Sequence, residues 1–299
     1  MIMKVPLASR ESFMSRLNDA LSSQSGFAAG KLGYSEQVWI TSAWASNQGP
    51  SSHLDSAIRA AARFHACYQL GAYPTDDTYL RTALEKFVES VSAMDFIAAH
   101  ESPLVQEIQK NLNLEGRVMP FDSLEPNREI PYNPQKCYLP SLRGKRVLII
   151  TSPAELLRER ANKVTFEATW AATGCPWFEP KSVEALGFDS LFDENTRNHF
   201  PSSESLITEI TSQLGPLEFD VALVAASCMA IPICAAIKRS GRIGISLGGH
   251  LQVLFGVQGK RWRDNATWQS NYWNENWIDM PPYLHPKSTN WLVDDGAYW

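Results

Sequence analysis

Three short apolar segments in the second half of the chain constrain the fold more than any other feature. They are KRVLIIT (145–151), FDVALVA (219–225) and RIGISL (242–247), and each is rich in branched aliphatic residues. Such runs are typical of parallel strands buried on both faces. Helical patterns lie between them, for example from Ile231 to Arg239,. We therefore predict an α/β fold with a Rossmann-like, doubly wound parallel sheet in the C-terminal half.

The N-terminal half also alternates between strand and helix patterns. One strand pattern lies within 26–33 and ends in a glycine turn, and a second covers 94–99,. Helical patterns cover 13–21, 54–70, 76–91 and 103–112,. Four prolines interrupt the periodicity just before the first apolar run,. We therefore predict an N-terminal α/β region (1–122), a proline-rich linker (123–142) and a Rossmann-like domain with a tryptophan-rich C-terminal extension (143–299).

Composition narrows the classes of partner and compartment. The formal net charge is −5 over 299 residues and there is no long basic run, which argues against a nucleic-acid-binding surface and favours small-molecule or protein partners,. The five cysteines are scattered without a C-x-x-C pair, so we expect reduced, buried thiols rather than disulfides or a zinc ribbon,. No apolar segment is long enough to span a membrane and the N-terminus lacks a signal-peptide pattern, so we expect a cytoplasmic protein,. Homo-oligomerisation stays open.

The strand over 242–247 leads directly into Gly248 and Gly249, and a helical pattern follows. A glycine pair permits a tight turn and lets a ligand approach N–H groups at a helix start, where the helix dipole favours an anion. Lys260, Arg261 and Trp262 add two cations and an aromatic ring that could complete a phosphate or ring-binding pocket,. Alternatively, the glycines only form the turn, and the basic residues cap the C-terminal end of the helix.

Other polar residues fall at the expected carboxyl ends of strands, where ligands bind in doubly wound sheets. Ser227 follows one apolar run and either bonds a nucleotide or ends its strand. His250 follows the glycine pair and either donates to a phosphate or caps its helix,. Trp262 either stacks on a ligand ring or packs in the core.

The glycine turn near the N-terminus carries a second candidate group. Ser35 is placed to cap the following helix, and Glu36 lies in its first turn, facing the turn at Gly33,. Glu36 could act as a base or metal ligand, or it could simply interact with the helix dipole. Lys31 could neutralise a ligand diphosphate or pair with Glu36.

Four segments together resemble a known family. They are LGGHLQVLFGVQGKRW (247–262), DVALVAASCMAIPICAAIKRSG (220–241), KRVLIITSP (145–153) and the terminal GAYW (296–299). They resemble bacterial proteins found with surface-polysaccharide biosynthesis and related to GT-D type glycosyltransferases. The resemblance covers residues 27–299 and is most specific in 248–262. It implies a Rossmann-like fold and transfer of a sugar from a nucleotide-sugar donor to a glycan acceptor, often with a divalent metal, Mn or Mg.

The family's N-terminal motif is arginine-x-glycine-aspartate-glycine-glutamate, which Lys31-Leu-Gly-Tyr-Ser-Glu36 matches in part. Gly33 and Glu36 match, whereas Tyr34 stands at the aspartate position and Ser35 at the second glycine. The resemblance implies that Glu36 handles the acceptor or a metal, and that Lys31 and the Gly248 segment hold the donor. Metal dependence stays open, because a hard divalent ion near a diphosphate prefers several carboxylate oxygens.

We therefore expect a glycosyltransferase-like enzyme. Two alternatives remain at this point. The chain could bind a nucleotide sugar without transfer, as a regulatory protein of the same pathway, or it could catalyse a different phosphoryl or acyl transfer on the same fold.

Overall fold

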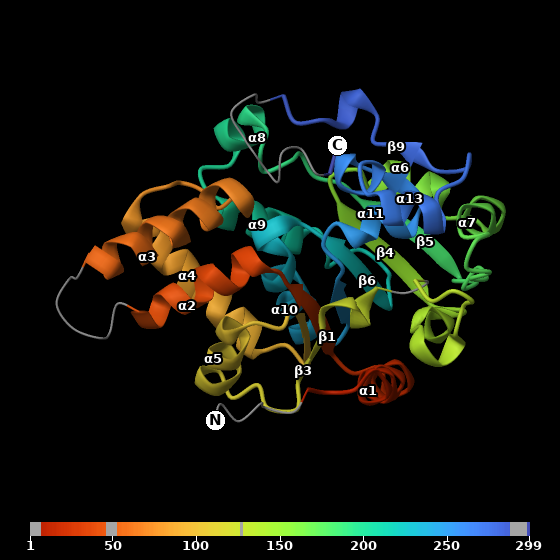
Figure 1. Ribbon diagram of the computed structural model, residues 1–299, viewed down its shortest axis with the longest axis horizontal. Helices are drawn as coiled ribbons and strands as arrows, with labels where there is room; N and C mark the ends of the chain where they lie inside the picture. The colour runs from red at the N-terminus through yellow and green to blue at the C-terminus, as the bar shows by residue number, and fades with distance from the viewer. Residues whose placement is uncertain (1–6, 46–52, 126–127, 288–297) are drawn as a thin grey trace.

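The computed structural model describes residues 7–45, 53–125, 128–287 and 298–299, and its centre is a seven-stranded sheet (Figure 1). Every neighbouring pair of strands in this sheet is parallel, and the strand order is β3-β2-β1-β7-β6-β4-β5. The strands are β1 (Phe27–Leu32), β2 (Phe96–Ala99), β3 (Val118–Pro120), β4 (Arg146–Thr151), β5 (Ser182–Leu186), β6 (Val221–Ala225) and β7 (Ile243–Ser246). The predicted α/β, Rossmann-like fold is confirmed.

Helices cover both faces of the sheet because successive strand residues point to opposite sides. In β1, Ala28 and Leu32 pack in one core cluster, whereas Phe27 and Ala29 pack in the other. The first face carries α2 (Tyr34–Ala45), α4 (Asp77–Ser92), α5 (Pro103–Asn111), α9 (Ser203–Ser212) and α10 (Ala230–Arg239). The second carries α1 (Arg10–Ser23), α6 (Ala154–Arg160), α7 (Lys163–Thr169), α11 (His250–Leu254) and α13 (Ala266–Tyr272).

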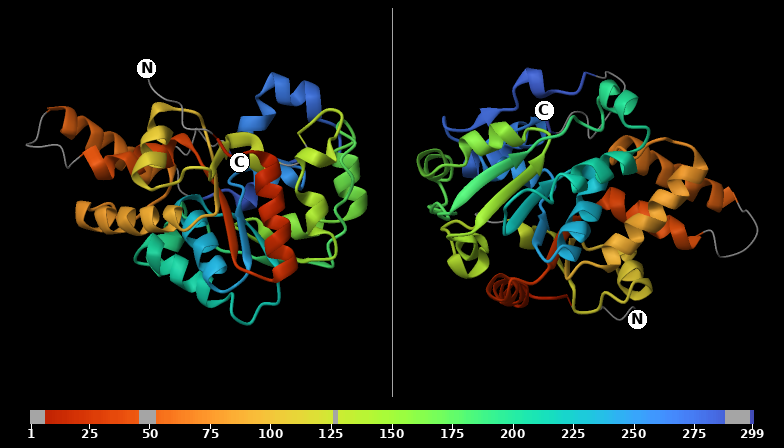
Figure 2. Two further views of the ribbon diagram at one scale, coloured as in Figure 1. Left: turned by 90° about the horizontal axis from the view of Figure 1, so that it is seen from below. Right: turned by 180° about the vertical axis from the view of Figure 1, so that it is seen from behind.

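The views in Figures 1 and 2 show the chain distributed around this sheet. Helices α2, α3 (His53–Phe64) and α4 gather at one end, and α6, α7 and α13 lie at the other. The front and rear views agree on this separation. None of the described helices is long and apolar enough to cross a membrane.

The connections diverge around β7, and this divergence positions the site. The chain leaves β1 and β6 through helices on the first face, whereas it leaves β7 and β4 through α11 and α6 on the second. In open α/β sheets a crevice forms where neighbouring strands send their connections to opposite faces. Here that crevice lies at the carboxyl ends of β1, β7, β6 and β4.

The predicted N-terminal region and Rossmann-like domain contribute to the same sheet, because β1 pairs directly with β7. Residues 123–142, predicted as a linker, join β3 to β4 and contain short 3-10 turns at Pro134–Lys136 and Leu139–Leu142. Leu124, Tyr138 and Leu139 from this segment are buried in the core of the second face.

Several local predictions need correction. Helix α2 begins at Tyr34, so Ser35 lies within it, and its Oγ is 3.0 Å from His65 Nδ1 instead of capping the helix. Helix α11 ends at Leu254, so Lys260 and Arg261 do not cap it but begin a separate short helix, α12 (Lys260–Arg263).

The tryptophan-rich C-terminal extension packs mostly against the second face. Trp268 and Trp277 are buried and contact Trp170 edge-on, with ring centroids 6.3 and 5.1 Å away. Trp273 is 52% exposed, and Trp291 lies outside the described residues. Two short parallel strands, β8 (Val257–Gln258) and β9 (Ile278–Asp279), join this extension to the chain after α11. All five cysteines are buried, as expected.

Candidate functional site

A cavity of about 830 Å³ opens at the carboxyl ends of four strands. The loops after β1, β4, β6 and β7 line it, so it occupies the crevice that the topology creates. Its volume lies in the range of small-molecule sites. All predicted site residues line the cavity except Lys260, which is exposed and not part of its wall. The sheet therefore brings together residues from both ends of the sequence.

The turn after β1 places Glu36 at this cavity. An ideal Cβ on Gly33 would lie 2.8 Å from Glu36 Oε2, so the glycine leaves room for the carboxylate to fold back over the turn. The buried Gln37 fixes the turn, because its Nε2 donates to Leu32 O and His100 O, both at 3.2 Å. This arrangement holds a carboxylate at the mouth of the crevice between β1 and its neighbours.

The carboxylates of the cavity do not form a divalent metal site. Tyr34, at the position of the family's aspartate, is 58% exposed and supplies no carboxylate. Glu125, the other glutamate of the cavity wall, is already bound to Lys31 and Arg128. No group of three or more His, Cys, Asp or Glu side chains that could hold a metal occurs among the described residues. On their own, the residues of the cavity therefore do not supply the several oxygen ligands that Mn or Mg prefers, and a metal here would depend on phosphate oxygens of the donor.

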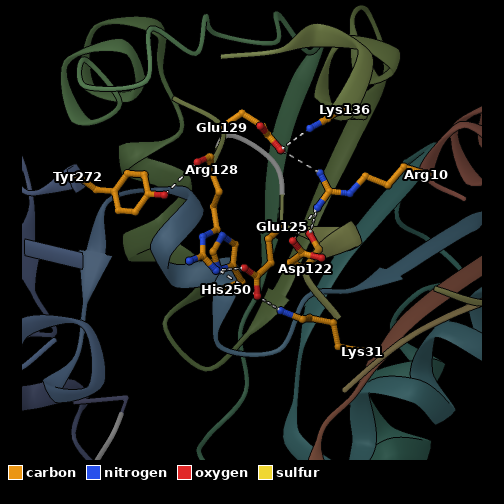
Figure 3. A network of polar contacts seen from close by, with 9 residues as sticks. All are labelled: Arg10, Lys31, Asp122, Glu125, Arg128, Glu129, Lys136, His250 and Tyr272. Carbon is orange, nitrogen blue, oxygen red and sulfur yellow. Dashed lines mark hydrogen bonds and ion pairs between the residues drawn. The ribbon is translucent and has the colours of Figure 1, made fainter. Parts of the chain in front are cut away.

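Lys31 does not pair with Glu36 as one alternative predicted. It is almost completely buried and forms an ion pair with Glu125, which also binds the guanidinium of Arg128 (Figure 3). Burial alone raises the pKa of Glu125, but its partners hold this pKa well below the usual range. Burial lowers the pKa of Lys31, against the attraction of Glu125. The pair is therefore a buried charge centre at one end of the cavity.

His250 completes this centre without a hydrogen bond to it. Its Nδ1 lies 3.9 Å from Glu125 Oε1, and its buried Nε2 has no hydrogen-bond partner among the described residues (Figure 3). Burial lowers the pKa of His250 to about 3, so the ring is neutral at pH 7. His250 does not cap its helix, because the N-cap position of α11 is Gly249 and no side chain caps that end.

Ser227 occupies a strained position after β6. It has φ of +51°, and Met229 N–H donates to Ala226 O at 2.9 Å across it. Ser227 is thus the first central residue of a tight turn, a position where positive φ favours glycine. Within the described residues its hydroxyl makes no hydrogen bond, and it lines the cavity. This strand–turn–helix geometry is that of a nucleophile elbow, but the next N–H, from Cys228, donates to Leu70 O and is not available to an oxyanion,.

The thiol of Cys228 is not a nucleophile candidate. Burial raises its pKa to about 12, and the nearby charge of Glu36 adds to the rise. The thiol is therefore protonated at neutral pH and is a poor nucleophile.

The Gly248–Gly249 turn differs from the predicted phosphate loop. Gly248 has φ of +55°, which explains a glycine there,. However, α11 has only five residues, and the first N–H groups of this helix, from His250 and Leu251, already donate to Leu247 O and Gly248 O. A Cβ on Gly249 would lie 2.2 Å from Tyr298 Cε1, so an aromatic ring covers this side of the turn.

The C-terminal aromatic residues form the adjacent wall. Tyr298 accepts a hydrogen bond at its hydroxyl from Arg261, whose guanidinium lies 4.9 Å from the Tyr298 ring centroid. Trp262 is buried beside Tyr298, with ring centroids 6.0 Å apart. Trp262 therefore packs in the core and also lines the cavity.

Sequence reasoning missed Glu125, Arg128 and Tyr298. Glu125 and Arg128 lie in the segment predicted as a linker, where no periodic pattern marks buried residues. Tyr298 belongs to the terminal GAYW segment, and its place in the resemblance was the one feature of the sequence that pointed to this residue. Comparisons with models of known protein families, with curated proteins and with solved structures gave no match.

Proposed function

We propose that this protein is a nucleotide-sugar-dependent glycosyltransferase that acts in the cavity at the carboxyl end of the sheet. One observation carries the proposal. The turn that bears Glu36 and the Gly248–Gly249 turn follow neighbouring strands, β1 and β7, and line the same cavity. The first turn carries the partial match to the N-terminal motif of the GT-D type glycosyltransferases, and the second lies where the resemblance is most specific, although more than two hundred residues separate them.

The chemistry of this wall suits transfer of a glycosyl group. A bond forms between the acceptor oxygen and the anomeric carbon, and the bond from that carbon to the diphosphate oxygen breaks. Glu36 accepts the proton of the acceptor hydroxyl as a general base. Arg128 and Arg261 line the cavity and supply positive charge near the departing diphosphate,. Positioning and electrostatic stabilisation supply most of the rate enhancement in reactions of this kind.

The test combines binding and turnover. Calorimetry against a panel of nucleotide sugars, with and without Mn or Mg, identifies a donor, and a donor-consumption assay with glycan acceptors measures transfer. We expect saturable binding of at least one donor and its consumption without a requirement for the metal. Binding without turnover supports the non-catalytic alternative, and mass spectrometry of the products detects phosphoryl or acyl transfer instead. If no nucleotide sugar binds, the proposal is wrong.

A further inference from the structure

We propose that Arg128, His250 and Trp268 form an anion subsite at one end of the cavity, which holds the diphosphate of the ligand. All three residues line the cavity. The subsite consists of side chains around Glu125, including that of His250, and not of the backbone N–H groups at the start of α11, where the sequence predicts phosphate binding. That the anion is the diphosphate of a nucleotide sugar rests on the proposed function. The subsite itself rests on the unpaired groups and the charge of this wall.

The first observation is a pair of buried nitrogen atoms with nothing to bind. Trp268 Nε1 and His250 Nε2 are both buried and have no hydrogen-bond partner among the described residues. The two rings are neighbours, with centroids 6.3 Å apart. An indole N–H can only donate, and a neutral imidazole can donate through one nitrogen. Because buried polar groups are nearly always paired, the unpaired indole N–H indicates a missing acceptor, and the same acceptor can bind His250 Nε2 in the tautomer that carries the proton on that nitrogen.

The second observation is an excess of positive charge. Glu125 is the single carboxylate between Lys31 and Arg128, and both cations bind it. Since His250 is neutral at pH 7, the cluster keeps one positive charge that no group in it balances. The two buried charges, Lys31 and Glu125, balance each other, and the surplus positive charge is that of Arg128, which lines the cavity, so an anion that enters the cavity can pair with it,.

One further cation, Arg261, extends this positive field along the cavity. His100 and Arg261 also line the wall. Burial lowers the pKa of His100, and the positive charges of Lys31 and Arg261 lower it further against the attraction of Glu125, so the added positive charge of this wall comes from Arg261. A neutral sugar hydroxyl could bond to the indole N–H but would leave the excess charge unbalanced. A phosphate group can both accept the unpaired N–H group and balance the excess positive charge, because its oxygens accept several hydrogen bonds and carry negative charge.

Arg128 is placed to change partners when a ligand enters. Its guanidinium lies 5.6 Å from the Trp268 ring centroid, and its side chain is 43% exposed. Glu125 and Arg128 line the large cavity and also a second one of about 310 Å³, so they form part of the wall between the two. A ligand oxygen that draws Arg128 away from Trp268 reaches the unpaired indole N–H.

The tryptophans of this region provide a matched test. Trp268 and Trp277 are equally buried, and their rings are 5.7 Å apart. Trp277 Nε1 donates to Tyr272 O at 2.9 Å, and Trp277 is not part of the cavity wall. Trp268 is part of the wall, and its Nε1 has no partner among the described residues. We expect Trp268→Phe to weaken diphosphate binding about tenfold, because a hydrogen bond to a charged group is lost. Trp277→Phe should instead lower the melting temperature and leave affinity unchanged.

The arginines provide a second pair. Arg263 is 45% exposed, pairs with Asp264 and Asp279, and lies outside the cavity wall. Calorimetry measures binding of inorganic diphosphate, uridine diphosphate and guanosine diphosphate, and of uridine as the uncharged probe, to full-length protein. We expect Arg128→Gln to weaken the diphosphates at least tenfold and to leave uridine binding unchanged, and Arg263→Gln to change neither.

The outcomes separate the subsite from the proposed function. If inorganic diphosphate binds and Arg128→Gln and Trp268→Phe weaken it, the subsite stands, even when no nucleotide sugar binds or is consumed. If nucleotide sugars bind and both variants, shown to be folded by circular dichroism, bind them as tightly as the wild type, the subsite is wrong while the function survives. If none of the anionic probes binds the wild type, the subsite is also wrong.

Discussion

At the scale of single residues, the two glutamates of the cavity have different tasks. Glu125 is committed to Lys31 and Arg128, whereas Glu36 folds over Gly33 in the first turn of α2. If Glu36 is the base, Glu36→Gln keeps its size and hydrogen-bonding reach but removes its basicity. We expect donor affinity to survive and turnover to fall about 100-fold or more.

The control for this variant is Glu11→Gln. Glu11 is also a first-turn acidic residue, in α1, and is not part of the cavity wall. The Glu11→Gln substitution should leave turnover at the wild-type level. Steady-state kinetics with saturating donor measure the turnover of both variants. Wild-type turnover in Glu36→Gln would show that Glu36 is not the general base.

Ser227 allows a test that separates backbone strain from ligand contact. Its positive φ disfavours a residue with a side chain by about 1 kcal/mol or more, whereas glycine adopts it readily,. Ser227→Gly relieves the strain and Ser227→Ala keeps it, but both remove the hydroxyl. We therefore expect the glycine variant to be the more stable of the two by about 1 kcal/mol in urea unfolding. Donor affinity should fall equally in both, and unchanged affinity would show that the hydroxyl does not touch the ligand.

At the scale of elements, the sequence predicts the strands and helices whose local hydrophobic pattern matches their burial in the fold. Strands β4, β6 and β7 are central and buried on both faces, so their apolar runs reveal them. Strand β3 has three residues and β5 is a partly exposed edge strand, so neither leaves an apolar run. The shared cavity follows from the predicted strand ends.

The charge centre could not be predicted in the same way. Glu125 and Lys31 are 94 residues apart, and their pairing depends on how the segment after β3 returns across the sheet. No local periodicity encodes that return, and a charged residue in a proline-rich segment is indistinguishable from a solvated one. The same reason applies to Tyr298, which reaches Gly249 only through the path of the whole C-terminal extension.

The contact between Gly249 and Tyr298 gives a prediction about elements. A side chain at Gly249 must displace the Tyr298 ring, and Trp262 is also within 3.0 Å of the added Cβ. We expect Gly249→Val to destabilise the protein by about 1 to 3 kcal/mol, as overpacking does. In a Tyr298→Ala background the same substitution should be less destabilising by about 1 kcal/mol, because the obstructing ring is gone. Additive free energies of unfolding in this double-mutant cycle would mean that the two residues are not in contact.

At the scale of the whole molecule, the buried charge centre makes stability depend on pH. The pKa of His250 is about 3 in the folded protein and near 6.5 in an unfolded chain,. Below pH 6.5 the unfolded state therefore binds a proton that the folded state does not, and the free energy of unfolding falls as pH falls. Glu125 acts in the same direction, but its contribution is present above its ordinary pKa of 4.5 and is lost only at lower pH.

The two groups therefore separate on the pH axis. Between pH 6.5 and 4.5 the His250 contribution should lower stability by up to about 1.4 kcal/mol per pH unit. His250→Gln removes this titration, so its free energy of unfolding, measured by urea titration, should change less steeply across this window than that of the wild type. Its stability at pH 7 can differ for packing reasons, so the slope is the measurement. Equal slopes in the two proteins would show that His250 takes up its proton while the protein is folded, and that its ring is not held neutral beside Glu125, Lys31 and Arg128.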